Sequence, residues 1–176
     1  SAGKVQERQP LTAKFTAAML REGASGLSSA YIAEKLDYYG TTLQTLATQR
    51  NTYITLYSAN RYFFDILPLL CKLVVSPDFP EEEFRTLKER NRQALSVDLM
   101  KVNVLASRIF SEQLFGAENP YGKSEQLADY DTLTTAHLRE FHSRYYTAEQ
   151  CRIVLSGRIT PEMKAAVKET FAAVPS

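Results

Sequence analysis

The chain has 176 residues, of which 44% are hydrophobic and 23% are charged, and its formal net charge is +1. This length is enough for one domain with its own core, and folding should bury roughly 70% of the surface of the unfolded chain. The balanced charge gives no reason to expect binding to nucleic acid or to an anionic membrane. No stretch approaches the ~20 apolar residues of a membrane helix, so we expect no membrane insertion.

The first helix is the clearest element of the sequence. Its apolar residues recur at helical spacing and form a single stripe, made of Leu11, Phe15, Ala18 and Met19. The pattern predicts a helix over residues 13–23. Gly23 suits the left-handed backbone position just beyond a helix end, where residues with a side chain are strained.

A second helix and a hairpin are expected next. Apolar residues at helical spacing predict a helix over 30–39, closed by Gly40. Residues 41–47 and 53–58 alternate in polarity, as strands with one buried face do. Because the connection between them is short and polar, we expect the two strands to form an antiparallel hairpin.

The rest of the chain predicts mainly helices, over residues 60–76, 81–102, 103–115, 134–146 and from 160 onward. Pro68 falls inside the first of these and should kink it, unless it lies in the first turn. Cys151–Gly157 is predicted to be a third strand, buried on both faces. This order of elements is typical of an α+β domain in which helices pack on one face of a largely antiparallel sheet.

The two cysteines indicate no disulfide framework. Cys71 lies in an apolar run and Cys151 opens the predicted third strand. We expect two buried free thiols, with a single disulfide as the alternative that sequence cannot place.

Several short motifs follow one another along nearly the whole chain. They are Gly40-Thr41-Thr42-Leu43-Gln44, Thr48-Gln49-Arg50-Asn51-Thr52, Pro77-Asp78-Phe79-Pro80-Glu81-Glu82-Glu83-Phe84, Leu114-Phe115-Gly116, Asn119-Pro120-Tyr121-Gly122, Phe141-His142-Ser143-Arg144-Tyr145-Tyr146-Thr147 and Val154-Leu155-Ser156-Gly157-Arg158-Ile159-Thr160-Pro161-Glu162. Each is weak alone. Together, in order and with compatible spacing, they resemble the insulinase/pitrilysin/processing-peptidase family of inverted-zincin metallopeptidases.

The resemblance implies a metallopeptidase-like α+β domain that lacks the first strands of the family's sheet. Residues 1–176 would then be a single inactive peptidase-like domain, a fragment that covers most of the first half of a two-domain bacterial family member. The resemblance also suggests a periplasmic or cell-envelope location, although no signal peptide is present in this sequence.

The catalytic motif of that family is absent from the first helix. Where the family has His-x-x-Glu-His, this chain has Lys14, Ala17 and Ala18, and the family's spacing places its distant glutamate ligand at Ala94. The imidazoles would bind zinc and the carboxylate would activate the metal-bound water. We therefore expect no zinc, no cofactor and no catalysis. A simpler interpretation of the same residues is two good helix formers beside a solvated lysine.

The remaining metal-ligating residues offer no second zinc site. His137 and His142 are five residues apart, so they lie about 140° apart around a helix and cannot chelate one ion. Each is expected on a helix surface or packed against a neighbour.

Three functions remain open from the sequence. The first is a non-catalytic domain that binds polypeptide through strand addition at the edge formed by Leu43, Gln44, Thr45 and Leu46. The resemblance implies that such a domain pairs in a clamshell with an active zinc peptidase subunit or a second domain of the same protein. This edge is equally consistent with a plain sheet edge or a dimer contact. The second is a purely structural or assembly role in a larger complex. The third is a hydrolase that acts through an unrecognised site.

Overall fold

Helices account for most of the computed structural model, which describes residues 2–175. The helices are α1 (Thr12–Met19), α2 (Ser29–Tyr38), α3 (Phe63–Val75), α4 (Glu81–Asp98), α5 (Val102–Phe115), α6 (Asp129–Thr132), α7 (Thr135–Tyr145) and α8 (Pro161–Thr170). The strands are β1 (Gly23–Ala24), β2 (Leu27–Ser28), β3 (Thr42–Ala47) and β4 (Thr52–Tyr57). None of the helices described here is long and apolar enough to cross a membrane.

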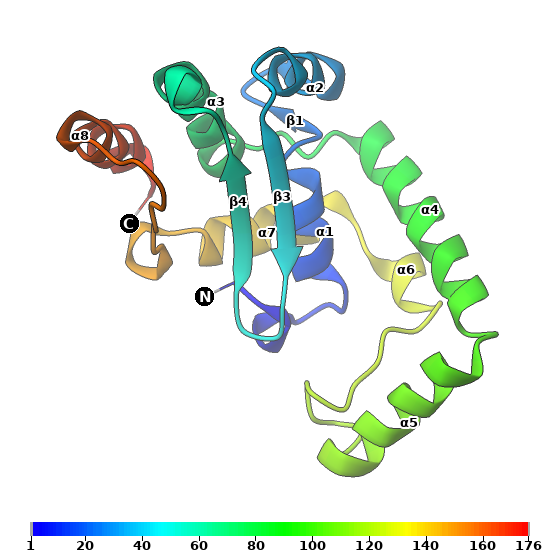
Figure 1. The fold of residues 1–176 in the computed structure, drawn as a ribbon. Coiled ribbons are helices and arrows are strands. Elements are labelled where there is room, and N and C mark those ends of the chain that lie inside the picture. Colours follow the sequence, from blue (N-terminus) through cyan, green and yellow to red (C-terminus); the bar gives the residue numbers. More distant parts are fainter. Residues whose placement is uncertain (1, 176) are drawn as a thin grey trace.

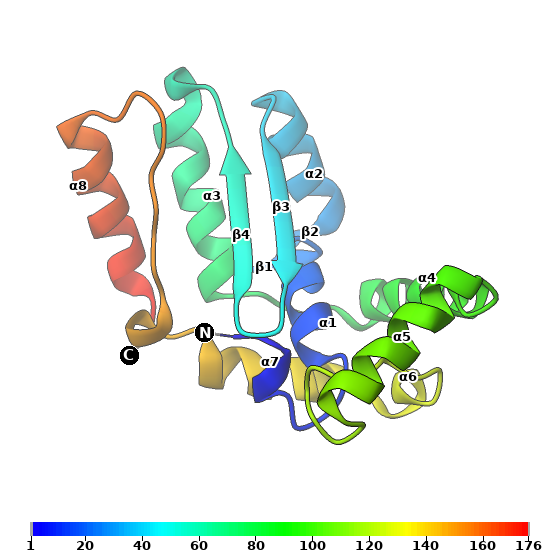
Figure 2. The same cartoon turned by 60° about the horizontal axis from the view of Figure 1, so that its bottom comes forward.

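The β3–β4 hairpin has one covered face and one open face (Figures 1 and 2). On the covered face, Leu43 packs with Ile32 of α2 and Ile66 of α3 in one apolar cluster. On the open face, Leu46 lies opposite Tyr53, and both side chains are exposed. The two strands alternate because successive side chains point to opposite faces. The predicted α+β fold, with helices on one face of an antiparallel sheet, is therefore confirmed.

The largest apolar cluster is built around α1. Phe15 contacts Phe84 of α4 and Tyr130 of α6 edge to face, with ring centroids 5.8 and 5.9 Å apart. The predicted stripe is confirmed at Leu11, Phe15 and Met19, which are all buried in this cluster, whereas Ala18 is only partly buried. Helix α1 thus holds α4 and α6 against the rest of the domain.

The residues before α1 pass beneath the turn of the β3–β4 hairpin. The N–H groups of Lys4 and Val5 donate to the carbonyl oxygens of Thr48 (3.0 Å) and Gln49 (2.9 Å). Gly3 lies so close to the backbone of Arg50 that no side chain would fit there. These contacts fasten residues 3–5 to the hairpin turn.

The predicted third strand is wrong. Residues 151–157 are in no strand, and Val154 is 80% exposed instead of buried. A strand needs a neighbour that accepts and donates its backbone hydrogen bonds, and β3 and β4 pair only with each other in the described part of the chain. Cys151 is accordingly exposed, whereas Cys71 is buried as expected and its thiol donates to the carbonyl oxygen of Thr170 (3.2 Å).

Two helix ends also differ from the prediction. Helix α1 ends at Met19, and Gly23 lies in β1 without a left-handed backbone. Its role is steric, because an added Cβ would sit 3.2 Å from the ring of Pro80. Helix α4 ends at Asp98, because the turn to α5 occupies the last residues of the predicted range. Gly40 closes the second helix with a left-handed backbone (φ 56°), as predicted.

Candidate functional site

The outward face of α1 carries basic side chains and the small side chain of Ala18. Of residues 12–20, only Lys14 and Ala18 are not buried, and the exposed Arg21 follows them on the same side of the helix axis. Ala17, which the resemblance would place at the family's general base, is buried. Lys14, Ala18 and Arg21 therefore share one face, whereas Ala17 is covered by its neighbours.

Lys14 is held by an ion pair instead of pointing freely into solvent. Its Nζ lies 3.2 Å from both carboxylate oxygens of Glu125 and 3.4 Å from the hydroxyl oxygen of Tyr130. The Tyr130 hydroxyl donates to the same carboxylate (3.1 Å). Burial, and then the negative charge of Glu125, raise the pKa of Tyr130 well above its ordinary value, so this phenol stays a donor.

A cavity of about 220 Å³ lies between residues 4–14 and the loop before α6. Its lining is mixed in charge, with the cations Lys4, Arg8, Lys14 and Lys123 and the anions Glu7, Glu118, Glu125 and Asp129. Glu7 precedes α1 in the chain, and its carboxylate accepts a hydrogen bond from the N–H of Ala13 in the first turn of that helix (2.6 Å). Burial raises the pKa of Glu7 to about 7, against the opposing effect of that hydrogen bond.

These residues do not fit a zinc ion. An alanine side chain has no donor atom, and the ammonium of Lys14 has no lone pair and is already bound to a carboxylate. Residues 2–175 contain no group of three or more histidine, cysteine, aspartate or glutamate side chains that could hold a metal. Ala94 lies on the exposed surface of α4, a different element.

The histidines have structural partners, as expected. The Nε2 atom of His142 lies 2.7 Å from the carbonyl oxygen of Val74, and its ring stacks on Tyr146 with centroids 4.7 Å apart. Burial lowers the pKa of His142. His137 caps the start of α7, where its Nδ1 accepts the N–H of Thr134 (3.2 Å).

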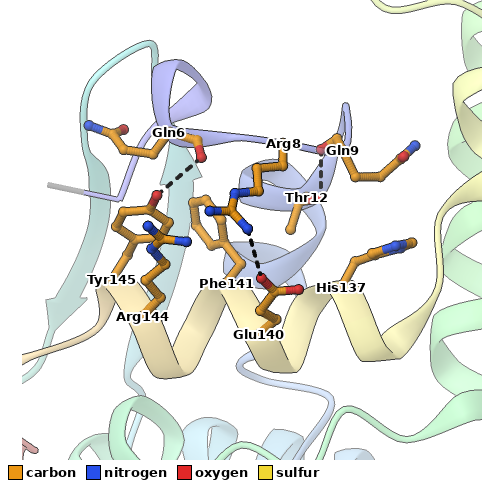
Figure 3. A pocket seen from close by; sticks show the side chains of 9 residues that line it. All are labelled: Gln6, Arg8, Gln9, Thr12, His137, Glu140, Phe141, Arg144 and Tyr145. Carbon is orange, nitrogen blue, oxygen red and sulfur yellow. Dashed lines mark hydrogen bonds and ion pairs between the residues drawn. The ribbon is translucent and has the colours of Figure 1, made fainter.

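A second, small hollow of about 40 Å³ lies between the N-terminal segment and α7 (Figure 3). Arg8 and Glu140 lie across it at 3.7 Å, and the hydroxyl of Tyr145 donates to the carbonyl oxygen of Gln6 (3.3 Å). This ion pair and this hydrogen bond to a backbone carbonyl cross the hollow and fasten the N-terminal segment to α7.

The expected peptide-binding residues all lie on β3. The N–H of Thr48 donates to the carbonyl oxygen of Asn51 (2.8 Å), so these two residues form the hydrogen-bonded pair nearest to the hairpin turn. Hydrogen-bonded and non-hydrogen-bonded pairs alternate along an antiparallel ladder. In the observed register, the backbone groups of Leu43 and Thr45 therefore point to the free edge, and those of Gln44 and Leu46 point toward β4.

Sequence reasoning missed Glu125, Tyr130 and Glu7, which surround Lys14 in the structure. Glu125 and Tyr130 are 111 and 116 residues away from Lys14 in the chain, so no local pattern connects them. One local signal was available for Glu7, which precedes a predicted helix start, where a carboxylate can accept free N–H groups.

Comparisons with known proteins agree with this fold. The model of a family described as "Peptidase M16 inactive domain" matches residues 132–176. A solved structure described as a peptidase M16 inactive domain from Pseudomonas fluorescens superposes with a TM-score of 0.91 and 26% identity, over 99% of this chain and 43% of that one. No curated protein matches.

Two further solved structures show the same fold at lower identity. A protease from Helicobacter pylori has a TM-score of 0.85 and 14% identity, and the alignment covers 99% of this chain and 43% of that one. The periplasmic protease PqqL from Escherichia coli has a TM-score of 0.79 and 16% identity, over 99% of this chain and 20% of that one. The chain thus spans less than half the length of these proteins. The resemblance expected from the sequence motifs is confirmed.

Proposed function

For a chain with the fold of the peptidase M16 inactive domain, we propose a non-catalytic role in polypeptide binding. The chain binds extended polypeptide along the free edge of β3, and it pairs in a clamshell with an active zinc peptidase subunit or with a second domain of the same protein. The structural neighbour described as periplasmic supports a location in the periplasm or cell envelope. The one observation that carries peptide binding is the unprotected edge of β3.

Most natural edge strands are protected against pairing with another chain. Protection comes from lysine, proline, a bulge or a covering element. Strand β3 reads Thr-Leu-Gln-Thr-Leu-Ala, without a charge or a proline, and it pairs with β4 over six residues without a bulge. The outward backbone groups of Leu43 and Thr45 can therefore bind an extended peptide, which joins the sheet as one more strand.

Replacing Thr45 with proline should weaken peptide binding about tenfold or more. Proline removes the outward N–H and places ring atoms in the path of the incoming strand, while the ladder to β4 keeps its bonds. The matched control is Thr45→Val, which keeps the N–H and the shape of the side chain. The measurement is fluorescence anisotropy with a labelled peptide of alternating threonine and valine, about six residues long. If both variants bind the peptide with equal affinity, β3 is not the edge that binds it.

Pairing with a peptidase is tested separately on the full-length protein from its own cell. We expect it to co-purify with a zinc peptidase that carries His-x-x-Glu-His, and we expect peptide cleavage by the complex to stop when zinc is chelated. Cleavage that survives chelation and scales with the amount of this chain would support the hydrolase hypothesis instead. Isolation with non-peptidase partners and no cleavage would support the assembly role.

One observation favours that assembly role as a second candidate. Helix α5 buries none of its residues within the described chain, although it carries large exposed apolar side chains. These include Val102, Ile109, Phe110 and Leu114. Exposed apolar surface of this kind is typical of a protein interface. Replacing Ile109 and Phe110 with serine would separate the two roles, because it should abolish assembly and leave binding to β3 unchanged.

A further inference from the structure

The loop between α5 and α6, residues 116–128, reaches α1 at Glu125, which pairs with Lys14, and we call this loop the strap. Figures 1 and 2 show it as a long connection without regular structure. Its residues are largely exposed, and only Gly122 is buried. Leu127 is the one residue of the strap that packs partly on the main core. Little apolar burial therefore holds the strap to the domain.

The strap is attached mainly through Glu125. Its carboxylate pairs with Lys14 of α1 at 3.2 Å and accepts a hydrogen bond from the hydroxyl of Tyr130 (3.1 Å). Its backbone carbonyl oxygen accepts a hydrogen bond from Nη2 of Arg108 on α5 (2.7 Å). One residue thus joins α1, α5 and α6. A further attachment to a segment distant in the chain, from Nε of Arg50 to the hydroxyl of Tyr121 (3.0 Å), is exposed.

The Lys14–Glu125 pair is better shielded than the other ion pairs of the described residues. The two side chains are 33% and 25% exposed, whereas those of Lys101 and Asp98 are 55% and 48% exposed. Partly buried charges are screened less by salt, and their attraction is larger than that of solvent-exposed pairs. A segment with few apolar contacts opens at low free energy, so this pair has a large share in keeping the strap closed.

We propose that the strap is a lid and that the Lys14–Glu125 ion pair is its latch. The closed strap forms one wall of the 220 Å³ cavity, and residues 4–14 form the other. When the latch breaks, the strap moves away from α1 and opens this cavity together with the basic face of α1. The device does not depend on peptide binding at β3, so either can fail without the other.

Hydrogen–deuterium exchange of the full chain tests the latch. In Lys14→Met and in Glu125→Gln, exchange at the amides of the strap should become about five- to tenfold faster, while exchange in α3 stays unchanged. Lys123, whose N–H donates to Asn119 within the strap, is a suitable reporter amide. The matched control is Lys101→Met, which breaks the more exposed pair next to α5 and should leave the strap as it was.

Two further measurements decide between a latch and a general loss of stability. The charge-exchanged variant Lys14→Glu with Glu125→Lys should restore slow exchange in the strap. Raising the salt concentration should speed exchange of the strap in the native chain and not in Lys14→Met. Unchanged exchange in both single variants, or equal acceleration of the strap and of α3, would overturn the proposal.

Discussion

Replacing Phe15 with alanine should lower the free energy of unfolding by about 3–5 kcal/mol. Phe15 is 1% exposed and lies between the rings of Phe84 and Tyr130. Its removal leaves a cavity at the point where three helices meet, and it also removes two edge-to-face ring contacts. Urea denaturation, with the slope of the transition compared between variants, gives the change in stability.

The control for this prediction is Phe110→Ala on α5. Phe110 is 66% exposed, so the same chemical change there should alter the free energy of unfolding by no more than about 0.5 kcal/mol. Similar losses at both positions would mean that α1 is not the centre of the main core. A loss only at Phe110 would place the important packing in α5.

Glu7 should make the domain less stable as the pH rises. Its pKa is about 7 in the folded chain and near 4.5 when unfolded. The folded state therefore holds the proton more tightly, and the stabilisation is fully present below about pH 4.5 and is lost as the pH rises through about 7. The difference in pKa corresponds to about 3 kcal/mol between those limits.

Glu7→Gln should remove this pH dependence. Glutamine keeps an oxygen that can accept the N–H of Ala13 but has no charge to bury. The free energy of unfolding is measured from pH 4 to pH 8 for the native chain and the variant, and the difference between the two curves isolates Glu7 from the other titrating groups. If the curve of Glu7→Gln runs parallel to the curve of the native chain, the assigned burial of Glu7 is contradicted.

Local patterns predicted the elements that depend on local physics. The stripe on α1 follows from helical spacing, and the β3–β4 hairpin follows from alternation and a short polar turn. A helix was predicted over residues 134–146, and α7 spans Thr135–Tyr145, with Thr134 and His137 capping its start. In each case the residues that decide the structure are at most a few positions apart, so the sequence contains the whole signal.

The wrong predictions concern elements whose partners are distant in the chain. Residues 151–157 have the composition of a strand, but pairing depends on a neighbouring strand that the described structure does not place beside them. Gly23 looked like a helix end, yet its lack of a side chain serves the contact with Pro80. Residue type alone cannot distinguish a glycine at a helix end from one needed for close packing, or a paired strand from an unpaired apolar segment.

The candidate site, too, was predicted only where its residues lie close together in the sequence. Lys14, Ala17 and Ala18 were recognised from a motif because they lie within one helical turn and a half. Alternation predicted the strand that contains Leu43–Leu46, and the family resemblance suggested that it is an edge strand. Which of these residues direct backbone groups outward follows only from the observed register. The cavity was not predicted at all, because its two walls, residues 4–14 and 118–129, are far apart in the chain.

By itself, the sequence determined the α+β class and the buried stripe of α1, because both depend on residue identity and short spacing. The tertiary structure alone decided what surrounds Lys14. It brought Glu125 and Tyr130 to Lys14 across more than a hundred residues and closed a cavity beside them. The physical reason is that an ion pair depends on distance in space, and only the packing of α1, α5 and α6 sets that distance.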